Sequence, residues 1–392
     1  MKIKSRPEDF VVEEFLSLPD FSPRGDYVIY RLKKRGLSTY DVLDRLIHGY
    51  RIPDRDIGIA GLKDKYALTS QYMSIRGRNA KEIREKSFML TPLGRAETPI
   101  GPHLLEKNRF KITLRSLKKT GISRIVDNLY EVLRYGFPNY FGEQRFGSIR
   151  YGGEFLAKRL ILGDFEGALK LYLSKWSSRE RPTIRGFKRF VSRHWGDWEE
   201  CLRVAPRSDE RFILSYLKDR PRDFLRAVNL INRRMLFLYI AAYQSYLWNE
   251  VASEFIRANL DEDGLIGFHY GAGQMVFYRT LTEELFEEFV RTKIPLLDHR
   301  VEFPTGRIGE IVERVIKREG ITIEDFRLDR VKNAFFKSVL RGLIVFPEGL
   351  EISEPEPDEI YRDGFKLTLS FFLPPGSYAS VLLRRIGIEG KK

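Results

Sequence analysis

Hydrophobic and polar positions alternate in short runs along the first third of the chain, separated by stretches rich in Pro, Gly, Ser and Asp. Strict alternation is typical of a strand with one buried face, whereas a short continuous apolar run suits a fully buried strand. Strands are expected at residues 10–15, 27–34, 57–62, 70–77 and 110–117. Between the second and third of these, Ser38 is placed to cap a helix that runs to about His48.

Apolar residues then recur at helical spacing through the middle of the chain. This spacing predicts helices at residues 122–136, 155–175, 233–257, 281–292 and 308–319. The acidic stretch 347–364 contains several prolines. It is expected to be a linker or loop because like charges and prolines resist compact structure. Strand alternation returns at 365–374. The order predicts a mixed α/β domain, built from about the first 150 residues and the last strands, with a helical insertion.

Composition sets the broad class. The chain has 392 residues, of which 43% are hydrophobic, enough for about two domains. It has no apolar run of the ~18 residues that a membrane span requires, and residues 1–15 lack the apolar segment of a signal peptide. The single cysteine, Cys201, excludes an intramolecular disulfide framework and a cysteine-based zinc site. We therefore expect a soluble, cytoplasmic protein.

Charge indicates the partner. The formal net charge of +14 favours a polyanion, because each phosphate that Lys or Arg neutralises releases a counterion. A basic proteome would give the same excess without such a partner. Charged residues make up 31% of the chain while it contains only four Gln and nine Asn, a pattern associated with heat-adapted proteins.

Common catalytic motifs are absent. The sequence contains no phosphate-binding loop, no GxGxxG after a strand, no HExxH and no CxxC, and its five histidines are scattered singly. If the chain is an enzyme, we expect it to work without a metal and without a nucleotide cofactor.

One candidate carboxylate is Asp64, in the turn "LKDKY". Its neighbours Lys63 and Lys65 favour an ionised carboxylate that can serve as nucleophile or base. The strand that follows offers a small residue for close approach of a substrate and two hydrogen-bonding side chains, namely Ala67, Thr69 and Gln71. The alternative is a solvent-facing turn, which residue types alone favour.

A second candidate is "NYFGEQRFG", residues 139–147, where three aromatics alternate with glycines and amides. Aromatic side chains can stack on a base, and Asn or Gln can bind a base edge. The alternative is a loop whose aromatics close a core, with Arg145 exposed. The chain start, with Lys4, Glu8 and Phe10, and the stripe at 241–251, with Gln244 and Asn249, carry little information alone.

Together these stretches resemble one family. The segments "PEDFVVEE", "AGLKDKYALTSQ", "PNYFGEQRFG" and "LPPGSYASVLLR", with a weaker "QSYLWN", look like the signature segments of the TruD-type tRNA pseudouridine synthases. The resemblance implies an α+β pseudouridine synthase core with a mixed, mostly antiparallel sheet flanked by helices, and a helix-rich α/β insertion domain that forms a cleft with it. It places the catalytic domain at 1–164 and 346–392 and the insertion at 165–345.

The resemblance also implies roles for individual residues. Asp64 corresponds to the catalytic aspartate, which either attacks ribose C1′ or removes a ribose proton. Phe141 corresponds to an aromatic that stacks on the target base, and Asn139 to a pocket asparagine. Lys4 corresponds to a lysine that pairs with the catalytic carboxylate, and Phe10 to a position near the pocket. The implied reaction isomerises uridine in tRNA, at position 13, with no metal or cofactor, in a monomer without an obligate protein partner.

Two other functions remain open from sequence. A tRNA-binding module or RNA chaperone would retain the basic charge and the aromatics without the reaction. A carboxylate-dependent hydrolase acting on nucleosides or glycans would ordinarily require a second acid.

Overall fold

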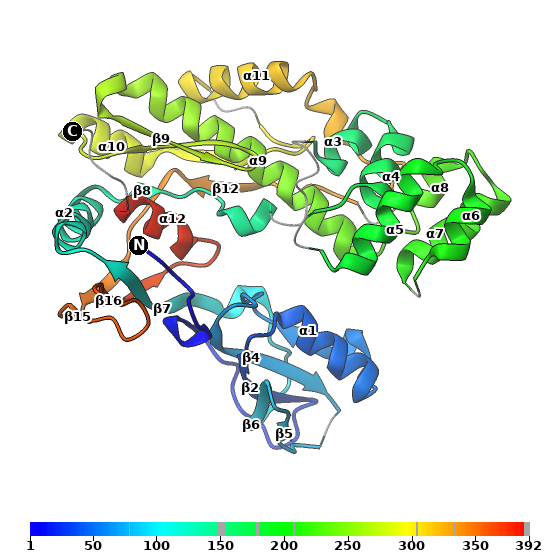
Figure 1. Ribbon diagram of the computed structural model, residues 1–392, viewed down its shortest axis with the longest axis horizontal. Helices are drawn as coiled ribbons and strands as arrows, with labels where there is room; N and C mark the ends of the chain where they lie inside the picture. Colours follow the sequence, from blue (N-terminus) through cyan, green and yellow to red (C-terminus); the bar gives the residue numbers. More distant parts are fainter. Residues whose placement is uncertain are drawn as a thin grey trace. The chain divides into compact units, whose positions relative to one another are not determined.

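The structure is a computed structural model that describes residues 1–77, 79–146, 154–177, 180–206, 208–302, 305–332 and 334–387 (Figure 1). The chain forms two compact units: unit 1 is Met1–Gly136 with Val345–Lys392, and unit 2 is Phe137–Ile344. The boundary expected at 164 therefore falls among the helices of unit 2, and the one expected at 345 falls beside a unit boundary. Compactness alone does not delimit an inserted domain, so both domain boundaries stay predictions.

Unit 1 is built on a mixed sheet. Its strands are β1 (Phe10–Leu16), β2 (Tyr27–Arg35), β3 (Ile57–Ile59), β4 (Leu68–Arg76), β5 (Ile83–Arg84), β6 (Phe88–Ala96), β7 (Leu105–Leu117), β14 (Glu348–Ile352), β15 (Glu356–Pro357) and β16 (Phe365–Leu373). Among the described residues the order is β14-β16-β7-β1-β4-β2-β6-β5, with β15 beside β16 and β3 beside β4. The pair β1–β4 is parallel and the other pairs are antiparallel. The mixed, mostly antiparallel sheet is thus confirmed.

The sequence patterns located most strands of this sheet. All five strands expected in the first third of the chain are present, although β3 ends three residues earlier than expected. The expectation of a linker or loop at 347–364 is wrong for β14 and β15, which pair with β16. The residues between β14 and β15, and those from 358 to 364, form no helix or strand. The acidic side chains of β14 are compatible with a strand since this edge of the sheet is exposed to solvent.

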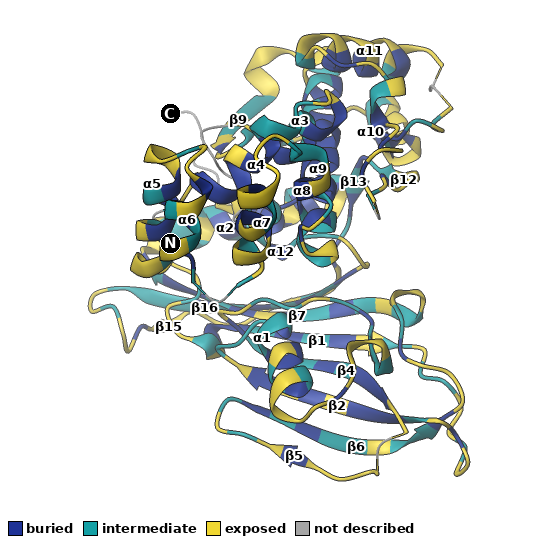
Figure 2. Ribbon diagram, turned by 90° about the vertical axis from the view of Figure 1, so that its right-hand side faces the viewer, coloured by how far each residue is buried: buried dark blue, intermediate teal, exposed yellow. Residues whose placement is uncertain are grey.

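Burial follows the position of each strand in the sheet. Figure 2 shows buried residues concentrated in β1, β2 and β4, whereas β5 and β6 at the edge are more exposed. Helix α1 (Thr39–Asp44) begins after Ser38, whose hydroxyl accepts a hydrogen bond from the Asp41 N–H, as expected for a cap. Val42 and Leu43 of α1 join a hydrophobic cluster with residues of β2 and β4. The remaining helices of unit 1, α2 (Lys119–Tyr135) and α12 (Ala379–Ile386), pack against each other.

Unit 2 is mainly helical (Figure 1). Its helices are α3 (Leu156–Ile161), α4 (Phe165–Ser174), α5 (Pro182–Arg193), α6 (Trp198–Val204), α7 (Asp209–Asp219), α8 (Phe224–Val228), α9 (Arg233–Asn259), α10 (Glu283–Arg291) and α11 (Arg307–Glu319). Its short strands are β8 (Phe137–Pro138), β9 (Leu265–Tyr270), β10 (Gly273–Tyr278), β11 (Lys293–Leu296) and β12 (Val339–Gly342), and β13 (Ile344–Val345) begins at its last residue. The expected helix at 155–175 is divided into α3 and α4, with Gly163 at a positive φ of 72° between them.

Helix α9 forms the centre of unit 2. It has 27 residues, and α3, α11, β10 and β11 pack around it. The expected apolar stripe is buried, since none of its residues is more than 3% exposed: Leu236, Tyr239, Ile240, Tyr243, Leu247 and Val251. Within the described part of the chain, no helix is both long enough and apolar enough to cross a membrane.

Candidate active site

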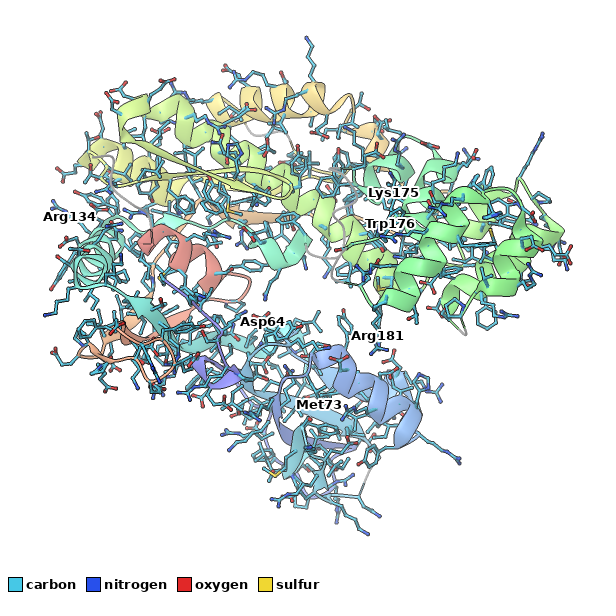
Figure 3. The ribbon with its side chains drawn as sticks, in the orientation of Figure 1. Asp64, Met73, Arg134, Lys175, Trp176 and Arg181 are labelled. Atoms are coloured by element: carbon cyan, nitrogen blue, oxygen red, sulfur yellow. The ribbon has the colours of Figure 1, made fainter. Side chains whose placement is uncertain are left out.

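Asp64 lies in the loop between β3 and β4 of unit 1 (Figure 3). Its side chain is 27% exposed, and its Oδ2 accepts a hydrogen bond from Lys4 Nζ at 2.8 Å. Among the described residues, nothing donates to Oδ1. The carboxylate therefore has one oxygen in an ion pair and one oxygen without a described donor.

Lys4 reaches this carboxylate from an unusual backbone conformation. Its backbone φ is +57°, in the left-handed region that residues other than Gly rarely adopt. Its ammonium lies 4.1 Å from the centre of the Phe10 ring, whose residue is only 3% exposed. The Lys4–Asp64 pair implied by the family resemblance is thus present, and Phe10 contacts the lysine through its ring face.

A buried arginine fixes the segment that carries Lys4. Arg115 on β7 is 1% exposed and donates from Nε and Nη2 to the two carboxylate oxygens of Asp9, at 2.9 and 2.8 Å. Its Nη1 donates to Asp358 Oδ1 at 2.9 Å. The backbones of Lys2 and Arg115 also exchange hydrogen bonds of 2.8 and 2.9 Å. Lys4 therefore lies between two points that are attached to the sheet.

A second buried cation fixes the loop itself. Lys34 on β2 is 1% exposed, and its ammonium donates to the carbonyl oxygens of Leu37, Lys63 and Asp64 at 2.7, 3.3 and 2.8 Å. Burial lowers the pKa of Lys34 to about 8. Sequence reasoning missed this residue, because a lysine within an alternating strand resembles any solvent-facing lysine.

The lysines that flank Asp64 do not pair with it. Lys63 Nζ lies 2.5 Å from Oε1 of the buried Glu14, and Lys65 Nζ lies 3.7 Å from Asp41 Oδ2. The expectation that these neighbours hold the Asp64 charge is therefore wrong. Adjacent residues in a turn point in different directions, and the partner comes from the distant residue Lys4.

The residues after the turn support the loop from below. Ala67 and Gln71 are fully buried and Thr69 is 1% exposed, so the expectation that they face a substrate is wrong. Gln71 Nε2 donates to the Gly61 carbonyl at 3.2 Å, and its Oε1 accepts from the Thr39 hydroxyl at 3.0 Å. These contacts hold the backbone of the loop against α1 and β4.

The second motif lies in unit 2, where residues 139–146 of it are described. Its aromatics are in the core, since Tyr140, Phe141 and Phe146 are at most 6% exposed. The Phe141 ring meets the Trp248 ring edge-on, with centroids 5.7 Å apart, and the Arg341 guanidinium lies 4.1 Å from the Phe141 centroid. One ring face of Phe141 thus carries a flat cationic group.

Asn139 is joined to the same arginine. Arg341 Nη2 donates to both the Asn139 carbonyl and its Oδ1, each at 2.7 Å. The backbone N–H of Asn139 donates to the Leu343 carbonyl at 2.8 Å. Arg341, 202 residues further along the chain, has no sequence signal that would single it out among the 68 Lys and Arg.

Asn249 of α9 fixes Phe141. Its Oδ1 accepts from the Phe141 N–H at 2.9 Å and its Nδ2 donates to the Phe141 carbonyl at 3.0 Å. The amide therefore pairs with both backbone groups of one residue, as a neighbouring strand would. Two sequence signals pointed to Asn249, namely the scarcity of amides and the weaker family segment "QSYLWN".

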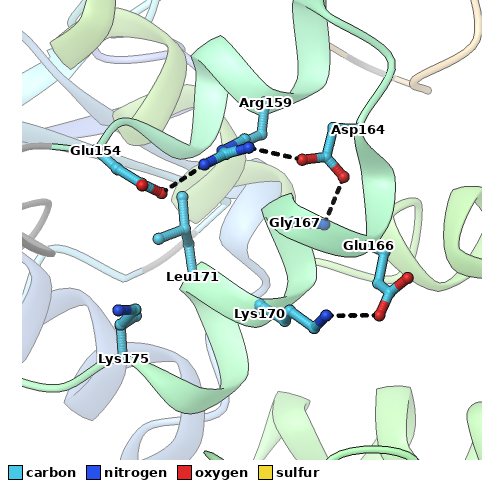
Figure 4. A pocket seen from close by; sticks show the side chains of 8 residues that line it. All are labelled: Glu154, Arg159, Asp164, Glu166, Gly167, Lys170, Leu171 and Lys175. Carbon is cyan, nitrogen blue, oxygen red and sulfur yellow. Dashed lines mark hydrogen bonds and ion pairs between the residues drawn. The ribbon is translucent and has the colours of Figure 1, made fainter.

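A cavity of about 290 Å³ lies elsewhere in unit 2, beside α4 (Figure 4). Its lining includes Arg159, paired with Glu154 and Asp164, and Lys170, paired with Glu166. The charged residues that line this cavity pair with one another, and none of the residues predicted for the active site lines it. The cavity is therefore separate from the candidate active site.

Comparison with known proteins agrees with the motifs. The family model of tRNA pseudouridine synthase D (TruD) matches residues 1–386. A probable tRNA pseudouridine synthase D 2 of Methanocaldococcus jannaschii is 35% identical over 399 residues, covering 100% of this chain and 93% of that protein. A tRNA pseudouridine synthase D of Aquifex aeolicus is 32% identical over 397 residues, covering 98% of each.

A solved structure has the same fold. The crystal structure of a putative tRNA pseudouridine synthase D from Methanosarcina mazei matches with a TM-score of 0.69 and 27% identity, covering 98% of this chain and 93% of that one. The fold and the match over the full chain define an enzyme of the pseudouridine synthase class, an isomerase. The chain belongs to the TruD family of tRNA pseudouridine synthases.

Proposed function

We propose that this chain converts uridine 13 of tRNA to pseudouridine, with Asp64 as the catalytic carboxylate. The observation that carries the proposal is the geometry of Asp64, which is partly exposed, ion-paired with Lys4 through Oδ2 and without a donor on Oδ1 among the described residues. A carboxylate in this state can act on a ribose as nucleophile or as base.

The reaction is a rearrangement in which atoms balance within the substrate. The bond between uracil N1 and ribose C1′ breaks, the uracil turns, and a bond forms between C5 and C1′. The proton leaves C5 and N1 gains one. Asp64 either attacks C1′ or removes a ribose proton. Lys4 compensates the carboxylate charge, and the Phe10 ring contacts the lysine ammonium through its face.

Residues of unit 2 are proposed to bind the base. A uridine must leave its stack to reach a catalytic carboxylate, which costs a few kcal/mol that contact with an aromatic partly offsets. The contact between Phe141 and Arg341 supports this role, because it indicates that a flat group fits against the ring. Asn139, held by Arg341, is proposed to contribute to the same pocket.

The test is release of tritium from tRNA labelled at uridine C5. The wild-type protein should release it, and Asp64→Asn should not, because the amide is neither a nucleophile nor a base. The matched control is Asp44→Asn, at an aspartate of unit 1 that is 73% exposed, and this variant should retain full activity. Release that persists in Asp64→Asn would refute the catalytic role.

Sequencing of the product tRNA locates the modified position. Pseudouridine at a position other than 13 would refute the site assignment while leaving the reaction intact. Tight tRNA binding without any tritium release by the wild-type protein would instead favour a binding module, and free uracil among the products would favour a hydrolase.

A further inference from the structure

The segment around α5 of unit 2 is strongly basic. Residues 175–193 contain seven Lys or Arg and one acidic residue, Glu180. That carboxylate is already occupied, because its Oε1 lies 2.6 Å from Nζ of the buried Lys188. The one carboxylate of the segment is therefore not available to its arginines.

Three arginines recur along α5, and a fourth directly precedes the helix. Arg181 precedes α5, and Arg185, Arg189 and Arg193 follow at intervals of four residues. Residues four apart on a helix lie on the same face, with a rise of about 6 Å per step. Arg185 is half-buried and the other three are exposed. In the part of the chain that the structure describes, none of the four forms an ion pair with a carboxylate.

This arrangement is unfavourable for the helix alone. Like charges four residues apart repel, and cations near a helix N-terminus oppose the helix dipole. Helix α5 has no acidic residue in its first turn, whereas α6 and α7 have two each. Some other exposed basic residues of unit 2 are paired, as Arg203 with Glu200 and Arg291 with Glu287. An external polyanion would remove this repulsion within α5.

An exposed indole lies beside this line of charge. Trp176 is 38% exposed, and the Arg189 guanidinium lies 5.2 Å from its ring centroid. Lys175 precedes it, and Figure 3 shows Lys175, Trp176 and Arg181 in the part of unit 2 that carries α5. Exposed tryptophan is unusual on a protein surface, and an indole beside guanidinium groups is a stacking platform for a nucleobase.

We propose that Trp176 and the α5 arginine row (Arg181, Arg185, Arg189 and Arg193) form an RNA-docking surface that binds the tRNA backbone. The arginines contact successive phosphates, and Trp176 stacks on an unpaired base. This inference rests on the proposed function, since it assigns to unit 2 a binding surface for the same tRNA. Arginine forms bidentate contacts with phosphate, which favours RNA over a less structured anionic surface.

The test compares two variants of equal charge change. The row variant Arg181→Gln/Arg185→Gln/Arg189→Gln should lower tRNA affinity about tenfold or more, and should reduce the slope of log affinity against log salt by about two to three units. The control Arg203→Gln/Lys218→Gln/Arg291→Gln removes three cations that are paired in the structure. It should leave the slope near the wild-type value.

Trp176→Ala gives an independent measurement. Loss of stacking should weaken tRNA binding while the salt slope stays unchanged, because an indole releases no counterions. In the row variant, kcat at saturating tRNA should equal that of wild type while KM rises. The melting temperature should be equal to or above that of wild type because repulsion within α5 is removed. A row-variant KM, affinity and slope like those of wild type would overturn the proposal.

A second arm distinguishes another class of partner. Vesicles containing phosphatidylserine should bind the wild type and the row variant equally weakly; vesicle binding lost only in the row variant, with tRNA binding retained, would refute an RNA surface. Failure of the proposed function is separate. If the wild-type protein forms no pseudouridine yet the row variant loses tRNA affinity, the docking surface stands and the catalytic assignment falls.

Discussion

The buried ammonium of Lys34 donates a hydrogen bond at 2.8 Å to the backbone carbonyl of Asp64. The proposed catalytic carboxylate is thus positioned through its main chain by one lysine, while a second lysine, Lys4, contacts its side chain. The two lysines perform different tasks, because Lys34 fixes where the loop lies and Lys4 compensates the charge. Substitutions at the two positions should accordingly be distinguishable.

Replacing Lys34 should impair both stability and turnover. Lys34→Met keeps an unbranched side chain but leaves three partly buried carbonyls without this donor. The cost is about 1–3 kcal/mol for each group that water does not reach. The tritium-release rate should fall with the loss of loop position. Lys33→Met is the control, since Lys33 is the neighbouring residue on the exposed face of β2. Equal behaviour of the two variants would contradict the anchoring role.

Lys34 also predicts a pH dependence. Burial lowers its pKa from 10.5 to about 8, so between these pH values the unfolded chain holds a proton that the folded chain has lost. The free energy of unfolding contributed by this group should therefore rise with pH in that window, by about 1.4 kcal/mol per pH unit. Urea unfolding at several pH values should show this rise in wild type relative to Lys34→Met. A constant difference between the two proteins would contradict it.

Lys4 should affect the chemical step more than binding. Lys4→Met removes the only described donor to the Asp64 carboxylate, and kcat should fall about a hundredfold, as for loss of one charge-stabilising donor. Affinity for tRNA should change little, and Lys4→Arg should restore part of the rate. Lys2→Met serves as the control, because Lys2 lies over the Tyr361 ring instead of the carboxylate. A loss confined to KM would argue against the assignment.

Phe141 can be tested against a neighbour of the same type and burial. Phe141→Leu and Phe146→Leu both shrink a buried ring, 6% and 1% exposed, so both should lower stability by a similar amount of about 1–3 kcal/mol. Only Phe141→Leu should lower turnover by tenfold or more, because only Phe141 carries the flat guanidinium on its ring face. Thermal melts and tritium release on both variants separate packing from base binding.

Arg115 is expected to be essential for stability. Arg115→Met would remove the buried cation that pairs with the carboxylates of Asp9 and Asp358, which costs about 3–5 kcal/mol. Arg109→Met on the same strand is the control, since Arg109 is 42% exposed and lies 4.0 Å from Glu13. The control should change the free energy of unfolding by less than about 1 kcal/mol.

The same cluster sets the response to acid. Burial acts to raise the pKa of Asp358. Hydrogen bonds to its carboxylate outweigh this effect and lower the pKa below 3.8; the donors are the backbone N–H groups of Ser116, Ile360 and Tyr361 and the side chain of Arg115. The stabilisation by this group is therefore present above pH 3.8 and is lost as the pH falls further. Wild type should resist acid unfolding to a lower pH than Arg115→Met, and coincident acid transitions would contradict this.

Local pattern predicted most elements of the fold. Alternation located β1, β2, β4 and β16 because each strand has one face against the core. Helical spacing located α9 and α11 because the apolar residues of each helix are buried. It failed for β14, whose exposed side chains carry no hydrophobic alternation and whose strand conformation comes from pairing with β16. Pairing energy of this kind depends on a partner that local sequence does not indicate.

The site was predicted in part. The motifs located Asp64 and Phe141, and the resemblance supplied Lys4 as the partner of the carboxylate. Lys34 and Arg341 were missed because their roles depend on burial and on tertiary contacts with the loop and the ring. Adjacency of opposite charges in the sequence also gave a wrong ion pair, since Lys63 is adjacent to Asp64 but pairs with Glu14.

Lys34 donates hydrogen bonds to backbone carbonyl oxygens of the loop, so the loop conformation does not depend on the side chain at position 64. A protein with that aspartate replaced by alanine should therefore keep its shape and still capture RNA without releasing a product. Immobilised on a resin and crosslinked in cell extract, it becomes a substrate trap. Sequencing of the captured transcripts would reveal every RNA that this enzyme recognises, independently of turnover.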